Sequence, residues 1–193
     1  MPGSDHSRFA SLHDVELCSL AATGERSAFG ELVRRHGSAV RGVLRRMGAQ
    51  GAEADDTAQD AFLAAFERIA EFRGEGTFAG WVKKIAARLY LRRLQRERRL
   101  GAMTAEAAED EAPRRGDADA VIDLEGALQA IAPAERLCVT MCFGAGLSHS
   151  EAAEALNLPL GTVKSHVKRG LDKLRTRLAP DDGAVLEGRR GNG

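Results

Sequence analysis

The sequence predicts an all-α protein with two small helical domains joined by a flexible linker, the second a helix-turn-helix domain. Three observations support this prediction. Apolar residues recur at the helical period of 3.6 through most of the chain. No segment sustains the alternation of a half-buried β-strand, and β-branched residues are few. Residues 100–122 form an acidic stretch with almost no large apolar side chains, which cannot bury enough surface to fold.

The first domain is expected to span residues 14–99, after a disordered N-terminus at residues 1–13. Ser27 is placed to cap its second helix, and the Gly-rich sequence FRGEGTF predicts a loop before its last helix. The apolar periodicity predicts helices over residues 14–22, 28–47, 54–72 and 78–99.

The second domain is expected to span residues 123–179 and to be followed by a disordered tail at residues 180–193. A helix over residues 121–131 leads to another that has Pro133 in its first turn and runs to residue 143. These two helices precede the segment that most strongly indicates a function.

That segment runs from Gly146 to Leu178 and predicts a helix-turn-helix. Ser148 and Glu151 have the spacing of a capping box, and Asn157 and Pro159 end the short helix that follows. A second helix starts near Leu160. Its apolar residues follow at intervals of four, four, three and four: Val163, Val167, Leu171, Leu174 and Leu178.

The opposite face of this second helix is basic, as expected of a helix that enters the major groove of DNA. The alternative is an ordinary helical hairpin with a solvated basic face. The capping box, the short turn and the clustering of charge on one side favour DNA binding. The polar face consists of Lys164, Ser165, His166, Lys168, Arg169 and Lys173.

Charge is distributed unevenly although the formal net charge is zero. Residues 73–99 hold nine Lys and Arg against two acidic residues, and residues 162–177 hold six against one. The stretch 101–125 between them holds eight acidic residues against two Arg. A polyanion responds to the local field, so both basic blocks remain candidates for nucleic-acid binding.

The three cysteines do not suggest disulfides or a metal site. The count is odd and the polar N-terminus does not resemble a secretory leader, so we expect a reducing cytoplasm and no membrane span. Cys138 and Cys142 lie one helical turn apart near His149, but they share an apolar helix and fall short of a four-ligand zinc set. We expect no metal and no cofactor.

Residues 14–99 and 121–178 resemble the bacterial sigma factors of the extracytoplasmic-function group. AERLCVTMCFGAGLSHSEAAEALNLPLGTVKSHVKRGLDKL resembles domain four of that family, with GTVKS its most specific part. ADDTAQDAF, residues 54–62, resembles its core-polymerase-binding helix. FRGEGTFAGWVKKIA, residues 72–86, resembles its promoter-melting segment. The order and spacing of these motifs make the set more specific than any one of them.

The resemblance implies that the first domain docks on the RNA polymerase core and opens the −10 promoter element, and that the second reads the −35 element. An anti-sigma protein often controls members of this family. For −35 DNA the implied contacts are Thr162, Lys164, Ser165, His166, Lys168 and Arg169. For −10 DNA they are Phe72, Arg73, Phe78, Lys83, Lys84, Arg88 and Arg92, and for polymerase they are Asp56, Gln59 and Asp60.

Several of these residues have a second interpretation. Phe78 and Trp81 share a face with Ile85 and are more easily explained as core anchors, while Tyr90 is left open. Asp55 and Asp56 could stabilise a helix N-terminus instead of contacting polymerase.

The sequence also departs from the family pattern. Arg88 and Arg92 replace the usual Asn and Asp, which favours phosphate contacts. His166 and Gly170 stand where Arg and Ala are usual.

Two other classes of function are alternatives for this sequence. A helix-turn-helix regulator, such as a repressor or a response-regulator output, would act without polymerase core. A receiver domain would need alternating strands and helices, which the first 99 residues lack. An enzyme is disfavoured because the chain has no P-loop, nucleophile elbow, HExxH or complete metal set.

Overall fold

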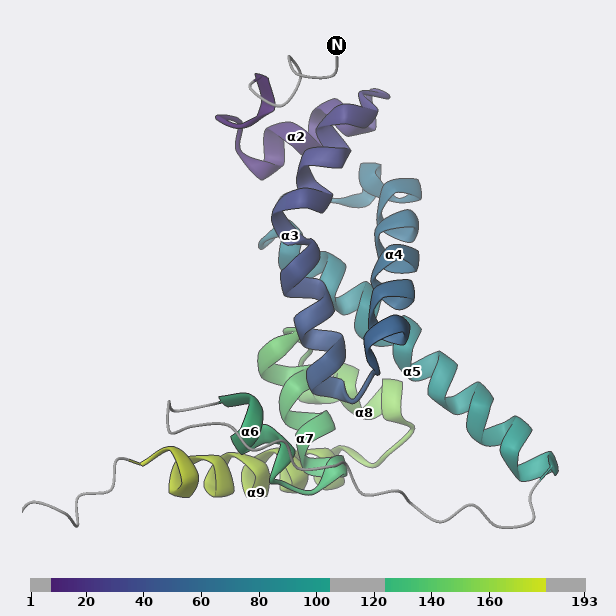
Figure 1. Ribbon diagram of the computed structural model, residues 1–193, viewed down its shortest axis with the longest axis vertical. Coiled ribbons are helices and arrows are strands. Elements are labelled where there is room, and N and C mark those ends of the chain that lie inside the picture. Colours follow the sequence, from purple (N-terminus) through teal and green to yellow (C-terminus); the bar gives the residue numbers. More distant parts are fainter. Residues whose placement is uncertain (1–7, 105–123, 180–193) are drawn as a thin grey trace, which may run out of the picture.

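The structure is a computed structural model that describes residues 8–104 and 124–179 (Figure 1). All regular elements in these ranges are helical, which confirms the all-α prediction. The first domain contains α2 (Asp14–Ala22), α3 (Arg26–Met47), α4 (Gly51–Glu67), the 3₁₀ turn η1 (Ile69–Glu71) and α5 (Phe78–Thr104). The second contains α6 (Leu124–Gln129), α7 (Pro133–Val139), the π-helix η2 (Thr140–Gly144), α8 (His149–Leu156) and α9 (Leu160–Leu178).

The segment before α2 was expected to be disordered, but residues 8–13 are held against the domain. The ring of Phe9 is buried with 2% of its surface exposed. The guanidinium of Arg35 donates to the backbone carbonyls of Phe9 and Leu12, at 2.8 Å each. A buried aromatic ring and satisfied carbonyls explain the order, and neither could be foreseen because Arg35 lies on another helix.

Two helix boundaries differ from the sequence prediction. Glu25, rather than Ser27, is the N-cap of α3, and its side chain accepts from the Ser27 N–H. The predicted helix over residues 54–72 begins earlier, at Gly51, where a capping box between Gln50 and Glu53 closes its N-terminus. It also ends earlier, at Glu67, and continues as η1.

The core of the first domain is built around packed aromatic rings where α3, α4 and α5 meet. Phe29 makes edge contacts with Phe62 and Phe78, at ring-centroid distances of 6.5 and 6.2 Å. Phe78 is 1% exposed, and Trp81 lies 6.1 Å from it. The interpretation as a core anchor is therefore correct for Phe78, and Trp81 packs against the core while half-buried. This packing fixes the start of α5 and the Gly-rich loop before it.

The helix-turn-helix has the local geometry that the sequence predicts. The Ser148 hydroxyl accepts from the Glu151 N–H at 3.2 Å, and the Glu151 carboxylate accepts from the Ser148 N–H at 2.8 Å. Asn157 ends α8 in the left-handed conformation, with φ 53°. Pro159 then precedes α9 as its N-cap residue. These features set the angle between α8 and α9.

The two domains pack directly on each other. One continuous cluster of buried residues extends from Leu44 and Ala87 in the first domain to Met141 and Val163 in the second. In Figure 1 the second domain lies at the end of α3 and beside α5, with α9 crossing below. α5 reaches Thr104, beyond the predicted boundary at residue 99, and most of the predicted linker lies outside the described residues.

None of the helices in the described ranges combines the length and the apolar character needed to cross a membrane.

Candidate nucleic-acid and polymerase interfaces

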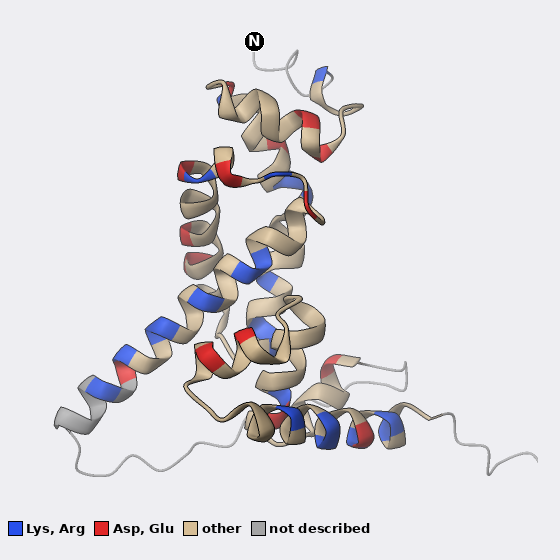
Figure 2. Cartoon of the chain, turned by 180° about the vertical axis from the view of Figure 1, so that it is seen from behind, with Lys and Arg blue, Asp and Glu red and all other residues tan. Residues whose placement is uncertain are grey.

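The outer face of α9 is the first candidate interface. Val163, Val167 and Leu174 are buried and hold the helix on its domain. Of the predicted −35 contacts, Lys164, Ser165, Lys168 and Arg169 are exposed, and Thr162 and His166 are half-buried. Figure 2 shows basic residues along the length of α9. The structure thus brings the predicted −35 residues together on one accessible side of a helix.

A buried acidic residue on α7, Glu135, restrains part of this face. The sequence alone did not indicate this residue. The Glu135 carboxylate is 6% exposed and accepts from Lys173 Nζ at 2.8 and 3.0 Å. Its Oε1 also lies 3.5 Å from Arg169 Nε. Hydrogen bonding to Lys173 is the main reason why the pKa of Glu135 is lowered despite burial. Glu135 follows Pro133 in the first turn of α7, where acidic residues are common, so its position in the sequence does not indicate this role.

Arg169 also contacts His166, one turn away on α9. Arg169 Nη2 lies 3.1 Å from His166 Nδ1, so the two side chains are in hydrogen-bonding contact on the helix surface. Lys164 and Lys168, by contrast, form no ion pair with any described residue. The cations of α9 therefore differ: some are held by neighbouring side chains, and others extend into solvent.

The second candidate interface is the basic face of α5 with the loop before it. Arg73, Arg88 and Arg92 are exposed, and Lys83, Lys84 and Phe72 are half-buried. Figure 2 shows Lys and Arg recurring along α5 as it extends away from the domain. Gly74 and Gly76 have φ of 75° and 86°, so this loop depends on glycine to turn.

One predicted −10 contact is wrong. Phe78 is sealed in the aromatic core, so its ring cannot reach a nucleotide without unfolding the start of α5. Tyr90, which was left open, is 3% exposed and is also unavailable for stacking. Burial raises the pKa of Tyr90 to about 12. Phe72 packs on Phe78 at 5.8 Å and remains half-buried.

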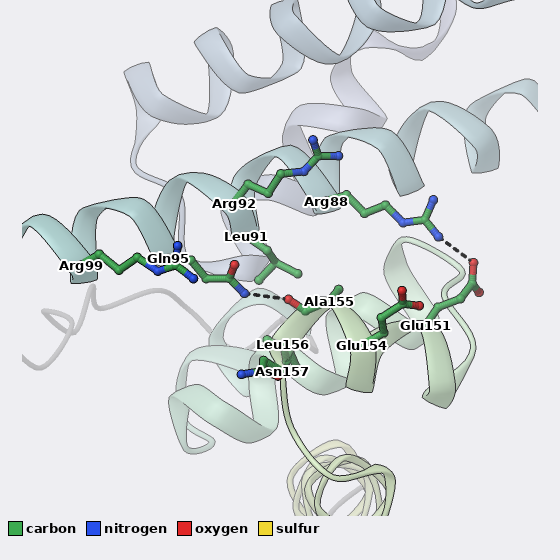
Figure 3. Close-up of a pocket in the computed structure, with 10 residues that line it drawn as sticks. All are labelled: Arg88, Leu91, Arg92, Gln95, Arg99, Glu151, Glu154, Ala155, Leu156 and Asn157. Atoms are coloured by element: carbon green, nitrogen blue, oxygen red, sulfur yellow. Dashed lines mark hydrogen bonds and ion pairs between the residues drawn. The ribbon is translucent and has the colours of Figure 1, made fainter.

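The basic face of α5 meets an acidic residue of the second domain. Glu151 of α8 pairs with Arg88 at 3.0 Å (Figure 3). Its carboxylate also lies 3.7 Å from Lys84 Nζ. Gln95 Nε2 donates to the Ala155 carbonyl at 2.9 Å. The sequence identified Glu151 only as half of a capping box. Its contact with α5 depends on how the domains pack, which no local pattern records.

The third candidate interface lies on α4. Asp56, Gln59 and Asp60 are exposed, as a docking surface requires. Asp55 instead faces α3, with its carboxylate 3.5 Å from Arg41 and 3.9 Å from Arg45. Because α4 begins at Gly51, Asp55 and Asp56 lie beyond its first turn, and helix capping does not explain them.

A groove between α3 and α4 adjoins these residues. Phe29, Gly30 and Val33 line one wall, and Ala58, Gln59 and Phe62 line the other. Leu63 at its rim is 56% exposed. A large apolar side chain with that exposure beside exposed polar residues is typical of a protein-binding surface.

The cysteines are free thiols buried to different degrees. Burial raises the pKa of Cys18 and of Cys138 to about 11, and it raises the pKa of the half-buried Cys142 as well. Within the described ranges, no three His, Cys, Asp or Glu side chains lie close enough together to hold a metal ion.

Comparison with known proteins identifies both halves of the chain. The model of Sigma-70 region 2 matches residues 32–100, and that of Sigma-70 region 4 matches residues 127–176. The ECF RNA polymerase sigma factor SigM of Mycobacterium tuberculosis is 30% identical over 166 residues, which cover 86% of this chain and 83% of SigM. The chain belongs to the ECF sigma factors. This confirms the resemblance inferred from the motifs, and it assigns α4 and α5 to region 2 and the helix-turn-helix to region 4.

Two relatives show how far the similarity extends. The ECF RNA polymerase sigma factor SigE of Mycolicibacterium smegmatis is 34% identical over 172 residues, which cover 82% of this sigma factor. The chain spans only 65% of SigE. The RNA polymerase sigma factor NccH of Alcaligenes xylosoxydans xylosoxydans is 33% identical over 175 residues, covering 86% of this chain and 94% of NccH.

Solved structures match as well. CnrH in complex with the cytosolic domain of CnrY superposes with a TM-score of 0.51 at 27% identity, covering 87% of this chain and 98% of that chain. The sigma factor RpoE in complex with the anti-sigma factor NepR, from Bartonella quintana, gives 0.53 at 20% identity and shares the fold.

Proposed function

We propose that this sigma factor joins the RNA polymerase core and directs transcription from promoters with −35 and −10 elements. The observation that carries the proposal is one chain with two accessible basic helices, α5 in region 2 and α9 in region 4. It acts by binding and has no catalytic residues of its own. Its place of action is the bacterial cytoplasm.

Region 4 reads the −35 element through α9. Lys164 and Lys168 supply charge for phosphates, and Thr162, Ser165, His166 and Arg169 are placed to contact bases or the backbone. The support is that these side chains share the outward face of the second helix of a capped helix-turn-helix. Contacts with Glu135 and His166 partly orient the Arg169 side chain before DNA binds.

Region 2 opens the −10 element through α5 and its preceding loop. Arg73, Lys83, Lys84, Arg88 and Arg92 supply the positive charge. Phe72 is the only aromatic residue of the predicted set that retains some exposure. With arginine at positions 88 and 92, this helix favours phosphate contacts over base-specific hydrogen bonds.

Polymerase core docks on α4. Asp56, Gln59 and Asp60 form the polar part of the docking surface, and the groove that contains Phe62 and Leu63 forms the apolar part. The support is exposure of polar and apolar groups side by side on one helix.

An anti-sigma protein controls the access of polymerase and DNA to these surfaces. The support is the match to CnrH, whose solved structure holds the cytosolic domain of a second protein, CnrY.

The assignment of α9 is tested by Lys164→Ala and Arg169→Ala in the full chain, with Arg175→Ala as the control. Arg175 lies on the same helix, is 78% exposed and pairs with Asp172, and it is about three turns beyond Lys164, so its loss changes charge equally at the opposite end of α9 from the proposed contacts. We expect the first two variants to weaken binding to promoter DNA, and Lys164→Ala to reduce the salt slope of binding by about one.

Polymerase association should be unchanged in these variants and reduced in Gln59→Ala. Binding is measured by fluorescence anisotropy with labelled promoter DNA and, separately, with polymerase core. A Lys164 or Arg169 variant that loses polymerase but keeps −35 binding would show that the roles of the domains are assigned wrongly. A protein that binds its promoters and represses them without core would be a helix-turn-helix regulator instead.

A further inference from the structure

A buried carboxylate of α7 lies behind the basic face of α9. The Glu135 side chain is 6% exposed, and its Oε1 lies 3.5 Å from Nε of Arg169 on α9. The Arg169 side chain is 57% exposed and continues outward to His166, where its Nη2 lies 3.1 Å from the ring Nδ1. Three side chains from two helices thus form a line of polar contacts from the interior of region 4 to its surface.

Glu135 is held in place independently of Arg169. Lys173 Nζ donates to both oxygens of its carboxylate, at 3.0 and 2.8 Å. The two helices pack tightly at this level, since a Cβ added at Gly170 would lie 3.4 Å from the Glu135 Cβ. Hydrogen bonding to Lys173 lowers the pKa of Glu135, so the group that meets Arg169 is a carboxylate. A carboxylate fixed by packing and by a second ion pair is a rigid anchor for a guanidinium.

The contact between Arg169 and His166 determines where the imidazole carries its proton. A guanidinium has five N–H donors and no acceptor, so the nitrogen that it meets must accept. In a neutral imidazole one nitrogen accepts and the other donates. Because Nδ1 is the acceptor, the proton lies on Nε2, the ring nitrogen farther from the backbone. His166 therefore presents a single N–H donor beyond Arg169.

A single donor has a restricted set of partners in the major groove of DNA. Guanine presents two acceptors there, N7 and O6. Adenine places an amino donor beside its N7, thymine places a methyl group beside its O4, and cytosine presents a donor. The Nε2–H group therefore fits guanine best. His166 lies in the N-terminal half of α9, which is the part of a recognition helix that contacts base edges.

We infer that Glu135 is a positioning residue for promoter reading: it anchors Arg169, which fixes His166 as the donor that selects guanine at one base pair of the −35 element. The inference rests on the proposed function, because it takes α9 as the reader of that element. The remaining N–H groups of Arg169 are left for a DNA phosphate. Contacts at this exposure are individually weak, so the three residues set a base preference, while the unpaired Lys164 and Lys168 supply charge for any sequence.

Two variants break the line of contacts at different points. Glu135→Gln keeps the size of the side chain and removes the charge that anchors Arg169. Arg169→Lys removes the guanidinium at an exposed position, so it tests the same link if Glu135→Gln does not fold. Lys173→Met is the matched control, because it breaks the other ion pair between α7 and α9 and leaves Arg169 with Glu135.

Base preference is measured by selecting duplexes from a randomised DNA library with the full chain and sequencing those that are bound. We expect the parent protein to prefer guanine roughly three- to ten-fold at one position, as one hydrogen bond allows. Glu135→Gln and Arg169→Lys should reduce this preference to about two-fold or less and leave the other positions unchanged. Lys173→Met should match the parent.

His166→Gln tests the identity of the reading group. A glutamine amide pairs with N7 and N6 of adenine, so the preference at this one position should change from guanine to adenine. A side chain that contacts only phosphate would instead change affinity equally for all sequences.

The tautomer is measured separately, from the ring nitrogen resonances of the free protein by NMR in mildly alkaline buffer. The chain has five histidines, and the spectrum of His166→Ala identifies the signals of His166 by their loss. We expect the proton on Nε2 in the parent and in Lys173→Met. In Glu135→Gln a larger share of the ring should carry the proton on Nδ1, because Arg169 is no longer held against it.

An unchanged guanine preference in both Glu135→Gln and Arg169→Lys would overturn the positioning role. Equal loss of preference in Lys173→Met would show that Glu135 only ties the two helices together. A parent protein with the His166 proton on Nδ1, or with no guanine preference that depends on His166, would overturn the reading assigned to this residue. If the parent selected no common sequence and did not initiate transcription with polymerase core, the proposed function would fall, while the ring resonances would still report on the contact with Arg169.

Discussion

Gly170 lies where α9 packs tightly against α7. A Cβ added there would lie 2.7 Å from Val139 Cγ2 and 3.4 Å from the Glu135 Cβ. Glycine in the middle of a helix costs about 1 kcal/mol relative to alanine, so the sequence alone makes Gly170 look like a defect. The tertiary contact reverses that conclusion, because the missing side chain lets the two helices approach.

Gly170→Ala should therefore destabilise the protein by about 1 kcal/mol, since overpacking against a stiff β-branched side chain outweighs the gain in helix propensity. Gly161→Ala is the control: it lies on the same helix with nothing within 4 Å of the added Cβ. The free energies of unfolding in urea measure both. A stabilised Gly170→Ala would contradict the close packing, and Val139→Ala should partly rescue the variant.

Glu31 is the most strongly perturbed carboxylate that the structure describes. Hydrogen bonds from Arg34 and Arg35, at 2.6 and 2.8 Å, lower its pKa to about 2 from 4.5, against the opposing effect of burial. A carboxylate with a depressed folded-state pKa stabilises the fold above its unfolded pKa, and this contribution is lost as the pH falls through the folded value.

Stability should thus fall as the pH is lowered from about 5 towards 2. Glu31→Gln should flatten this slope and lower the free energy of unfolding at pH 7, because Arg34 and Arg35 lose a charged partner. Urea unfolding at several pH values gives the slope, with the exposed Glu67→Gln as the control. Parallel pH profiles for the parent and Glu31→Gln would show that Glu31 carries no proton linkage.

At the scale of the element, the capping box of α8 has two structural roles. It closes the N-terminus of an eight-residue helix that would be marginal alone, and it positions Glu151 toward α5. Ser148 is thus linked through Glu151 to the contact between the domains.

Ser148→Ala should cost about 1 kcal/mol of stability through loss of the cap. The exposed Ser38→Ala, on α3, should be neutral. Thermal unfolding followed by circular dichroism measures both changes. An unchanged melting temperature in Ser148→Ala would show that Glu151 and the packing of α8 suffice without the hydroxyl.

At the scale of the whole molecule, the shared core couples the two domains. The buried cluster runs without a break from α2 to α9, so separating the domains exposes apolar surface in both. The single tryptophan, Trp81, reports on the first domain, whereas helical circular dichroism reports on both.

The two signals should give one coincident urea transition while the domains are packed together. In 0.5 M salt, where the contacts of Glu151 with Lys84 and Arg88 are screened, the transitions should move apart. A fluorescence transition that is already separate at low salt would contradict the coupling.

Much of the architecture follows from the sequence because it depends on local rules. The bounds of α2, the start of α5 at Phe78, the capping box at Ser148 and the stop at Asn157 all reflect helical period and cap chemistry within a few residues. The faces of α9 were also predictable, since Val163, Val167 and Leu174 are buried as their spacing requires.

What only the tertiary structure decided involves residues far apart in the chain. The burial of Phe9, the restraint of Arg169 by Glu135 and the pairing of Arg88 with Glu151 each join separate elements. The periodicity of apolar residues indicates which face of a helix is apolar, but it does not indicate which other helix covers that face. For this sigma factor, the sequence determined the two basic helices that we propose bind DNA, and the packing of the domains determined which of their cations are paired with carboxylates.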